Sequence, residues 1–232
     1  MVSRDAVSRR TPKRGNLAED AAEYLRKAIL TGDLKPGERI DQDRVADDLG
    51  ISRLPVREAL IALDQEGLVQ NLPRRGSYVA SLSREDVIDH YQLFGQVSGL
   101  AAARAVARMS DDDVAELVDL NRRLVHAPSV AEQERLNFEF HRRINAACAS
   151  QRIISMVRLL SRSLPMPYDK LPPEWLAEAE QQHADVLDAF ARRDTLAAQR
   201  SMEQHISASG RHAVTVLEGL GFFDASDEQA SA

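Results

Sequence analysis

Apolar residues recur every three or four positions along most of this chain, which is the period of a helix with one buried face. One short stretch departs from that period. There, LVQN and SYVA are each typical of a strand, and the connection LPRRG between them predicts a hairpin. From Ser83 onward the helical period returns and no strand signal recurs. The sequence therefore predicts a mainly α protein that divides near residue 80.

Before that division, the sequence predicts three helices. The first covers about residues 17–30 and is followed by the helix breakers of the segment TGDLKPG. The second begins at the N-cap candidate Asp41 and stops at Gly50, and the third begins at a second N-cap candidate, Ser52. Two helices joined by a short turn and followed by a hairpin indicate a winged helix-turn-helix, which we assign to residues 16–80. Residues 1–15 are expected to form a flexible basic tail.

After the division, an all-helical bundle of about six helices is expected over residues 83–222. Ser83 and Ser110 are N-cap candidates for the first two helices, and Pro128 separates the second helix from the third. The proline-rich segment LPMPYDKLPP predicts a loop, because proline continues neither a helix nor a central strand. Two more helices follow it, over about 174–192 and 195–219. Residues 223–232 are small and polar, and we expect a flexible tail.

The charge of the two regions differs. Residues 1–80 carry 14 basic and 13 acidic side chains, whereas residues 81–232 carry 16 and 23, so the net charges are +1 and -7. No apolar run reaches the roughly 18 residues that a membrane-spanning helix needs, and the basic N-terminus has no apolar stretch behind it. The sequence thus favours a cytoplasmic protein without a membrane partner. A single cysteine, Cys148, excludes a disulfide scaffold.

Hydrogen-bond donors cluster at the start of the third helix. Ser52, Arg53 and Arg57 lie where a recognition helix presents side chains to the base edges of the major groove. The arginine fork matches guanine, and the serine hydroxyl can donate to phosphate. Arg74 and Arg75 beside Gly76 place more positive charge at the hairpin. The alternative is that these arginines are ordinary solvated charges on a small helical domain.

The run LGISRLPVREALIALDQEGLVQNLPRRGSYV resembles the winged-helix signature of the GntR family of bacterial transcription regulators. The resemblance implies that Ser52, Arg53 and Arg57 contact DNA from the recognition helix, and that Arg75 with Gly76 does so from the wing. One position departs from the family pattern. Many members carry arginine where this chain has Asp43, and the neighbouring Arg44 is the candidate replacement, although it starts about 100° around the helix.

Four further donors have the spacing of a metal site. Asn137 and His141 are four residues apart and share a helix face, while His183 and His205 belong to the last two helices. Donors from three helices can converge in a bundle core, and imidazole suits Zn, Ni, Co or Mn. The alternative is that the histidines are solvated or core residues, which is the commoner fate of a lone histidine on a helix.

The segments NFEFHRRI, EQQHADVLDAF and MEQHI are similar to the ligand-binding domain of the FadR-like branch of that family, the FCD-type domain. The resemblance implies that Asn137, His141, His183 and His205 ligate a divalent ion, with asparagine in place of the more usual aspartate. A neutral amide oxygen is a poorer ligand than a carboxylate, so we expect weaker metal binding and stronger anion capture. Phe94 stands where members often carry an arginine.

These features together predict a metabolite-controlled transcriptional regulator. It would bind an inverted repeat of double-stranded DNA as a homodimer, because one recognition helix reads only a few base pairs. The effector would be a small organic acid or similar ligand bound near a divalent ion, with Zn, Ni or Mn as the main candidates. Two other classes stay open: a metal-dependent enzyme with a three-histidine site, and a helical protein-interaction module. We expect no enzyme, because no H-E-x-x-H type general base accompanies the histidines.

Overall fold

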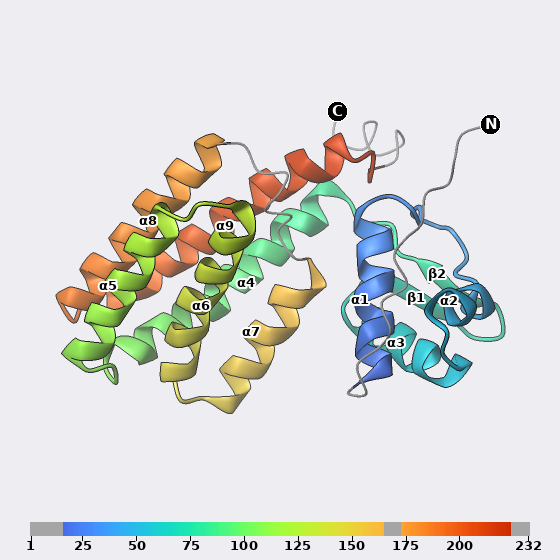
Figure 1. The fold of residues 1–232 in the computed structure, drawn as a ribbon, viewed down its shortest axis with the longest axis horizontal. Helices are drawn as coiled ribbons and strands as arrows, with labels where there is room; N and C mark the ends of the chain where they lie inside the picture. Colours follow the sequence, from blue (N-terminus) through green and yellow to red (C-terminus); the bar gives the residue numbers. More distant parts are fainter. Residues whose placement is uncertain (1–15, 165–172, 224–232) are drawn as a thin grey trace. The chain divides into compact units, whose positions relative to one another are not determined.

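The computed structural model describes residues 16–164 and 173–223, and these form two compact units (Figure 1). Residues 16–82 and 220–223 make up the first unit, and Ser83–Gly219 make up the second. The predicted fold class is confirmed, since a winged helix-turn-helix precedes a bundle of six helices. The predicted proline-rich loop and the two predicted tails lie outside the described residues, apart from their end residues Leu164, Pro173 and Phe223.

The first unit contains three helices and one hairpin, namely α1 (Leu17–Leu30), α2 (Gln42–Leu49), α3 (Arg53–Gln65), β1 (Val69–Leu72) and β2 (Gly76–Val79). Asp41 caps α2 as predicted, because its carboxylate accepts the backbone N–H groups of Asp43 and Arg44. Gly50 ends α2 with a φ of 65°, a left-handed conformation that glycine adopts without steric cost. Ser52 occupies the N-cap position of α3, but its side chain makes no capping hydrogen bond.

The hairpin is antiparallel and pairs Val69 with Val79 and Leu72 with Gly76. Its connection includes Arg74 at a φ of 63°, and Gly76 follows at 106°. The side chain of Asn71 fixes the hairpin to α3 by donating to the Leu60 carbonyl, 3.1 Å away. The wing is therefore held against the recognition helix by a specific polar contact as well as by packing.

A buried ion pair joins the ends of α1 and α3. Arg26 donates from Nε and Nη2 to both carboxylate oxygens of Glu66, at 2.8–3.0 Å. The two side chains are only 8% and 9% exposed. Such a bidentate pair satisfies most of the polar groups that burial would otherwise leave without partners, and it fixes α1 against the C-terminal end of α3.

The second unit consists of the helices α4 (Arg84–Val106), α5 (Asp111–Val125), α6 (Val130–Ala147), α7 (Gln151–Ser163), α8 (Pro173–Ala191) and α9 (Thr195–Gly219). Ser83 and Ser110 begin α4 and α5 with capping boxes, in which the serine hydroxyl and an aspartate three residues later each accept a backbone N–H. The two longest helices, α4 and α9, lie side by side (Figure 1), and the remaining helices pack around them.

Two glycines let α4 and α9 approach to backbone contact. A Cβ atom on Gly95 would overlap with the Ser207 hydroxyl and lie 2.7 Å from the Glu203 carbonyl oxygen. One on Gly99 would lie 2.7 Å from the Gln199 carbonyl oxygen. Any larger residue at either position would push the two helices apart.

Candidate functional site

The exposed face of α3 carries the predicted DNA contacts. Ser52, Arg53 and Arg57 are all exposed. Arg57 lies one helical turn beyond Arg53, so both side chains leave the same face of the helix. Leu54 and Ile61 are also exposed beside them, and an apolar side chain at such a place can contact the methyl group of thymine. The geometry is thus that of a helix able to enter a major groove.

Carboxylates of α2 divide the predicted arginines into two groups. Arg53 forms an ion pair with Asp43, and Arg44 lies 3.9 Å from the carboxylate of Asp48. Arg57 has no ion-pair partner within residues 16–164 and 173–223. The same holds for Arg74 and Arg75. The positive charge of the wing and of Arg57 therefore remains available to an anionic ligand.

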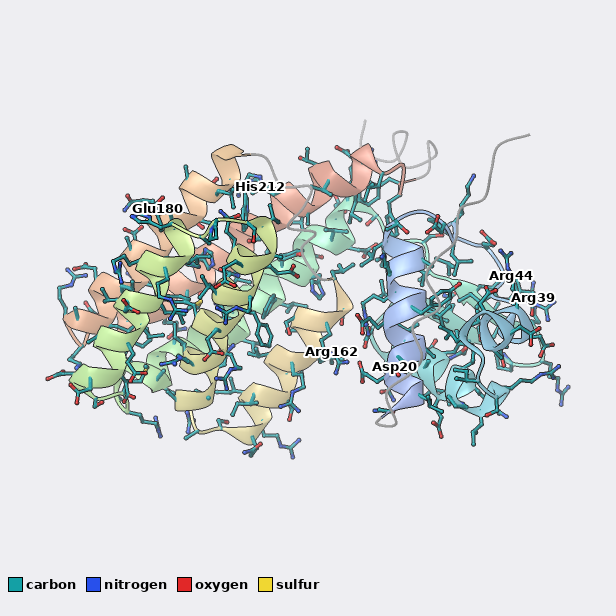
Figure 2. The ribbon with its side chains drawn as sticks, viewed as in Figure 1. Asp20, Arg39, Arg44, Arg162, Glu180 and His212 are labelled. Carbon is teal, nitrogen blue, oxygen red and sulfur yellow. The ribbon has the colours of Figure 1, made fainter. Side chains whose placement is uncertain are left out.

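A further arginine, which the sequence analysis did not identify, lies beside the hairpin. Arg39 pairs with Tyr78 in a bridge beside β2. Its guanidinium lies across Gly76, since a Cβ atom at that glycine would come within 3.2 Å of the Arg39 Nε. Figure 2 labels Arg39 and Arg44, both projecting from the part of the winged helix around α2. Because Arg39 precedes α2 by three residues and reaches the wing only through folding, its spacing gave no signal.

Three imidazoles meet inside the second unit. His141 of α6, His183 of α8 and His205 of α9 have ligand atoms that all lie within 4.8 Å of one another. The Nε2 atom of His205 is 3.1 Å from that of His183 and 3.3 Å from that of His141. His183 and His205 are only 1% and 4% exposed, whereas His141 is half-buried. The predicted convergence of these three residues is therefore present in the fold.

The spacing of these nitrogens fits one divalent ion. Two nitrogens bound tetrahedrally at about 2.05 Å from the same Zn²⁺ lie roughly 3.3 Å apart. Two of the three separations between these nitrogens, 3.1 and 3.3 Å, are close to that value, and the third pair of ligand atoms lies within 4.8 Å. His141, His183 and His205 could thus share an ion, with any adjustment falling on the pair His141 and His183.

Two amide side chains orient the rings. Nδ1 of His183 lies 3.1 Å from the Asn121 Oδ1, and Nδ1 of His205 lies 2.9 Å from the Gln182 Oε1. An amide oxygen only accepts, so each Nδ1 carries the proton and each Nε2 presents its lone pair. Neither amide was predicted. Asn121 had a signal, because it is a polar residue one turn after the buried Leu117 on α5, but Gln182 had none.

Burial keeps the cluster uncharged. Loss of hydration lowers the pKa of His141 to about 4 and lowers the pKa values of His183 and His205 well below the usual histidine range. Phe140 stacks on the His183 ring with centroids 4.4 Å apart, which adds to this apolar environment. The three rings are therefore neutral at pH 7, the state in which imidazole binds metal.

The fourth predicted ligand, Asn137, is half-buried and lies one turn before His141 on α6. Its side chain makes no hydrogen bond with other described residues, so it is free to turn toward an ion. His212 pairs instead with Glu178, 3.3 Å away, and Figure 2 shows it between α8 and α9. Glu139 is held by Arg142 and Arg143 on the same helix, so it does not serve as a general base for the cluster.

Two protein-family models match the chain. Residues 17–79 match the model described as bacterial regulatory proteins, gntR family, and residues 89–208 match the FCD domain. Among known proteins, the HTH-type transcriptional repressor RspR of Escherichia coli K12 is 30% identical over 190 residues, which are 78% of this chain and 82% of RspR. An uncharacterized HTH-type transcriptional regulator of Mycobacterium tuberculosis, Rv0043c, is 28% identical over 179 residues, or 75% of this chain and 72% of that protein.

Solved structures share the fold. Escherichia coli McbR/YncC has a TM-score of 0.65 at 22% identity, covering 88% of this chain and 98% of that one. A GntR family member from Pseudomonas syringae pv. tomato has a TM-score of 0.53 at 23% identity, covering 91% and 90%. The matching families and relatives are transcriptional regulators, in agreement with the prediction that this chain is not an enzyme. No helix among the described residues is long and apolar enough to cross a membrane.

Proposed function

This chain belongs to the GntR family of transcriptional regulators, with a DNA-binding GntR domain followed by an FCD domain, and we propose that a divalent ion and a small anionic effector in the FCD domain control its affinity for an operator. One observation supports this most strongly. The bonds to Asn121 and Gln182 leave His183 and His205 with Nε2 lone pairs 3.1 Å apart in a buried site beside a third imidazole, and a cation between these nitrogens relieves that repulsion without breaking either bond.

The DNA-binding half of the proposal depends on charge and exposure. Arg57 reads base edges from α3, while Arg39, Arg74 and Arg75 hold phosphates or the minor groove at the wing. Ser52 has a hydroxyl that no capping bond occupies, so it is available to donate to a phosphate. A duplex that neutralises these groups releases counterions, so binding should weaken steeply with salt. This activity takes place at the chromosome, in the cytoplasm.

A homodimer suits a winged helix-turn-helix of this kind, because two-fold symmetry lets two recognition helices read an inverted repeat. The surface shared by α4 and α9 supports this assembly. Leu93 and Leu100 of α4 and Leu196 of α9 are about half exposed, and polar residues of the same two helices line a groove of about 460 Å³. Arg200 and Glu203 both line that groove, so in a two-fold contact each can face the opposite charge on the partner. Leu93→Glu should then convert the dimer to a monomer, as measured by light scattering.

The effector half of the proposal depends on the neutrality of the site. His141, His183, His205 and Asn137 bring no negative charge, so a bound divalent ion would keep its charge of +2 in a poorly hydrated interior. Such an ion supplies positive charge and open coordination positions for an anion. A small organic acid would therefore bind together with the ion, and each would raise the affinity of the other by the same factor. Asn137→Asp should weaken that coupling by supplying the negative charge from the protein.

The test starts from the full-length protein and a pool of random duplexes. We expect repeated selection to yield an inverted repeat, which would serve as the operator in fluorescence anisotropy. Arg57→Ala should weaken operator binding by about 1–3 kcal/mol and relax the sequence preference. Chelation, or addition of Zn²⁺ with acetate or citrate, should change the operator affinity of the wild type and leave that of His183→Ala unchanged. A regulator that selects no sequence, or ignores every ion and acid tested, contradicts the respective half of the proposal.

A further inference from the structure

Asp43 places a negative charge next to the first arginine of the recognition helix. It is the second residue of α2, and its carboxylate pairs with the Nε of Arg53, the first residue of the recognition helix. Both side chains are exposed. The pair therefore spans the turn between the two helices of the helix-turn-helix, on the side that faces a ligand.

Within the fold the carboxylate has only a weak role, which is a favourable interaction with the dipole of α2 from its first turn. An acid in the first turn of a helix commonly caps it, but Asp41 already accepts the backbone N–H groups at the start of α2. Asp43 accepts no backbone N–H among the described residues, and Arg53 is its described partner. In water, an exposed pair of this kind contributes only about 0–1 kcal/mol to stability, so folding gives little reason for it.

The atoms used in the pair point to a task in recognition. Asp43 engages Nε of Arg53, the inner nitrogen of the guanidinium, so its contact is not with the two terminal amino groups. Those two groups form the end-on fork that donates to O6 and N7 of guanine. Without a partner, the long arginine side chain would sample many rotamers. The carboxylate thus selects a direction for the fork before DNA arrives.

We propose that Asp43 determines operator specificity by holding Arg53 for end-on recognition of a guanine in each half-site. This inference depends on the proposed DNA-binding function. The carboxylate also lowers the affinity for other DNA sequences. Where Arg53 turns aside to a phosphate, Asp43 loses its partner close to the DNA backbone, and the negative charge of Asp43 repels the phosphates. One residue of α2 thereby favours the correct sequence and penalises incorrect ones.

The test compares two variants with the same change of charge. Asp43→Asn and Asp47→Asn each remove one negative charge from α2, and Asp47 is exposed and has no described side-chain partner. Both full-length variants should bind a scrambled duplex more tightly than the wild type does, since each removes a charge that repels phosphate. Only Asp43→Asn should lower the ratio of operator to scrambled affinity, by up to about fivefold, which is the limit that an exposed ion pair sets on how firmly it holds Arg53.

Two further measurements make the result specific. Repeating the selection with Asp43→Asn should lose the preference at one base pair in each half-site and keep the others. Arg53→Ala should weaken binding to both duplexes, because it leaves Asp43 unpaired, and should weaken operator binding more, because the guanine contact is also lost. Adding Asp43→Ala to it should restore the scrambled-duplex affinity. Equal specificity ratios for Asp43→Asn and Asp47→Asn overturn the inference while leaving the proposed function intact. A wild-type protein that prefers no sequence overturns both.

Discussion

Replacing His183 with alanine should abolish the stabilisation that a divalent ion gives to the helical unit. An ion present at 100 times its dissociation constant stabilises the folded state by about 2.7 kcal/mol. For a unit of the size of Ser83–Gly219, that corresponds to a rise in melting temperature of roughly 5–10 °C. The His183→Ala variant retains two imidazoles, whose Nε2 atoms are 3.3 Å apart, and two ligands hold an ion far less tightly than three or four.

The quantity to compare between the wild type and His183→Ala is the rise in melting temperature that the ion causes, because the substitution also changes the stability of the metal-free protein. It leaves the buried Oδ1 of Asn121 without its partner, which costs about 1–3 kcal/mol. Protein treated with a chelator would be melted with and without Zn²⁺, Ni²⁺ or Mn²⁺, each in the presence and absence of acetate. His212→Ala is the matched control, since His212 lies on α9 but pairs with Glu178. Equal shifts in the wild type and His183→Ala, or none in the wild type, would refute the metal site.

Three other perturbations test separate parts of the molecule. First, burial makes the pKa of His141 about 4, and those of His183 and His205 low, against 6.5 in the unfolded chain, so the unfolded chain binds protons first as the pH falls. Metal-free protein should lose stability in urea melts between pH 6.5 and 4, by up to about 1.4 kcal/mol per pH unit for each ring, and a flat profile there contradicts neutral buried rings. Second, Arg26→Ala should destabilise the winged helix by about 3–5 kcal/mol, because Glu66 stays buried without its partner, whereas the apolar pair Arg26→Met with Glu66→Leu should come close to the wild type. Urea denaturation measures both, and equal losses would show that the charges themselves stabilise the fold. Third, Gly95→Ala should destabilise the bundle by about 1–3 kcal/mol, as seen by thermal melting, while Gly219→Ala, which meets nothing within 4 Å, should not.

Local signals in the sequence predicted most of the fold. The serines and aspartates at helix starts, the glycines at helix ends and the period of the apolar residues located the helices, because each of these signals acts over only a few residues. Ser52 shows the limit of such signals. It lies at the expected N-cap position, yet no hydrogen bond forms there, since capping also requires a side-chain rotamer that a sequence does not specify.

The candidate site was predictable where one residue type determines its chemistry. Histidine is rare in this chain and binds metal well, so His141, His183 and His205 were identified from different helices. Asn121 and Gln182 were missed, because an amide acquires its role only from the ring that it faces across 62 or 23 residues of chain. Arg39 and the Asp43 to Arg53 pair were missed for the same reason, since both contacts form through tertiary structure.

The backbone contact between α4 and α9 makes these two helices one rigid element. Gly95 and Gly99 bring carbonyl oxygens of α9 against α4, so neither helix can slide past the other without a collision. His205 lies on α9, and α4 begins at Arg84, only five residues after the last strand of the winged helix. A displacement of α9 at His205 is therefore shared by α4 rather than absorbed between the two helices.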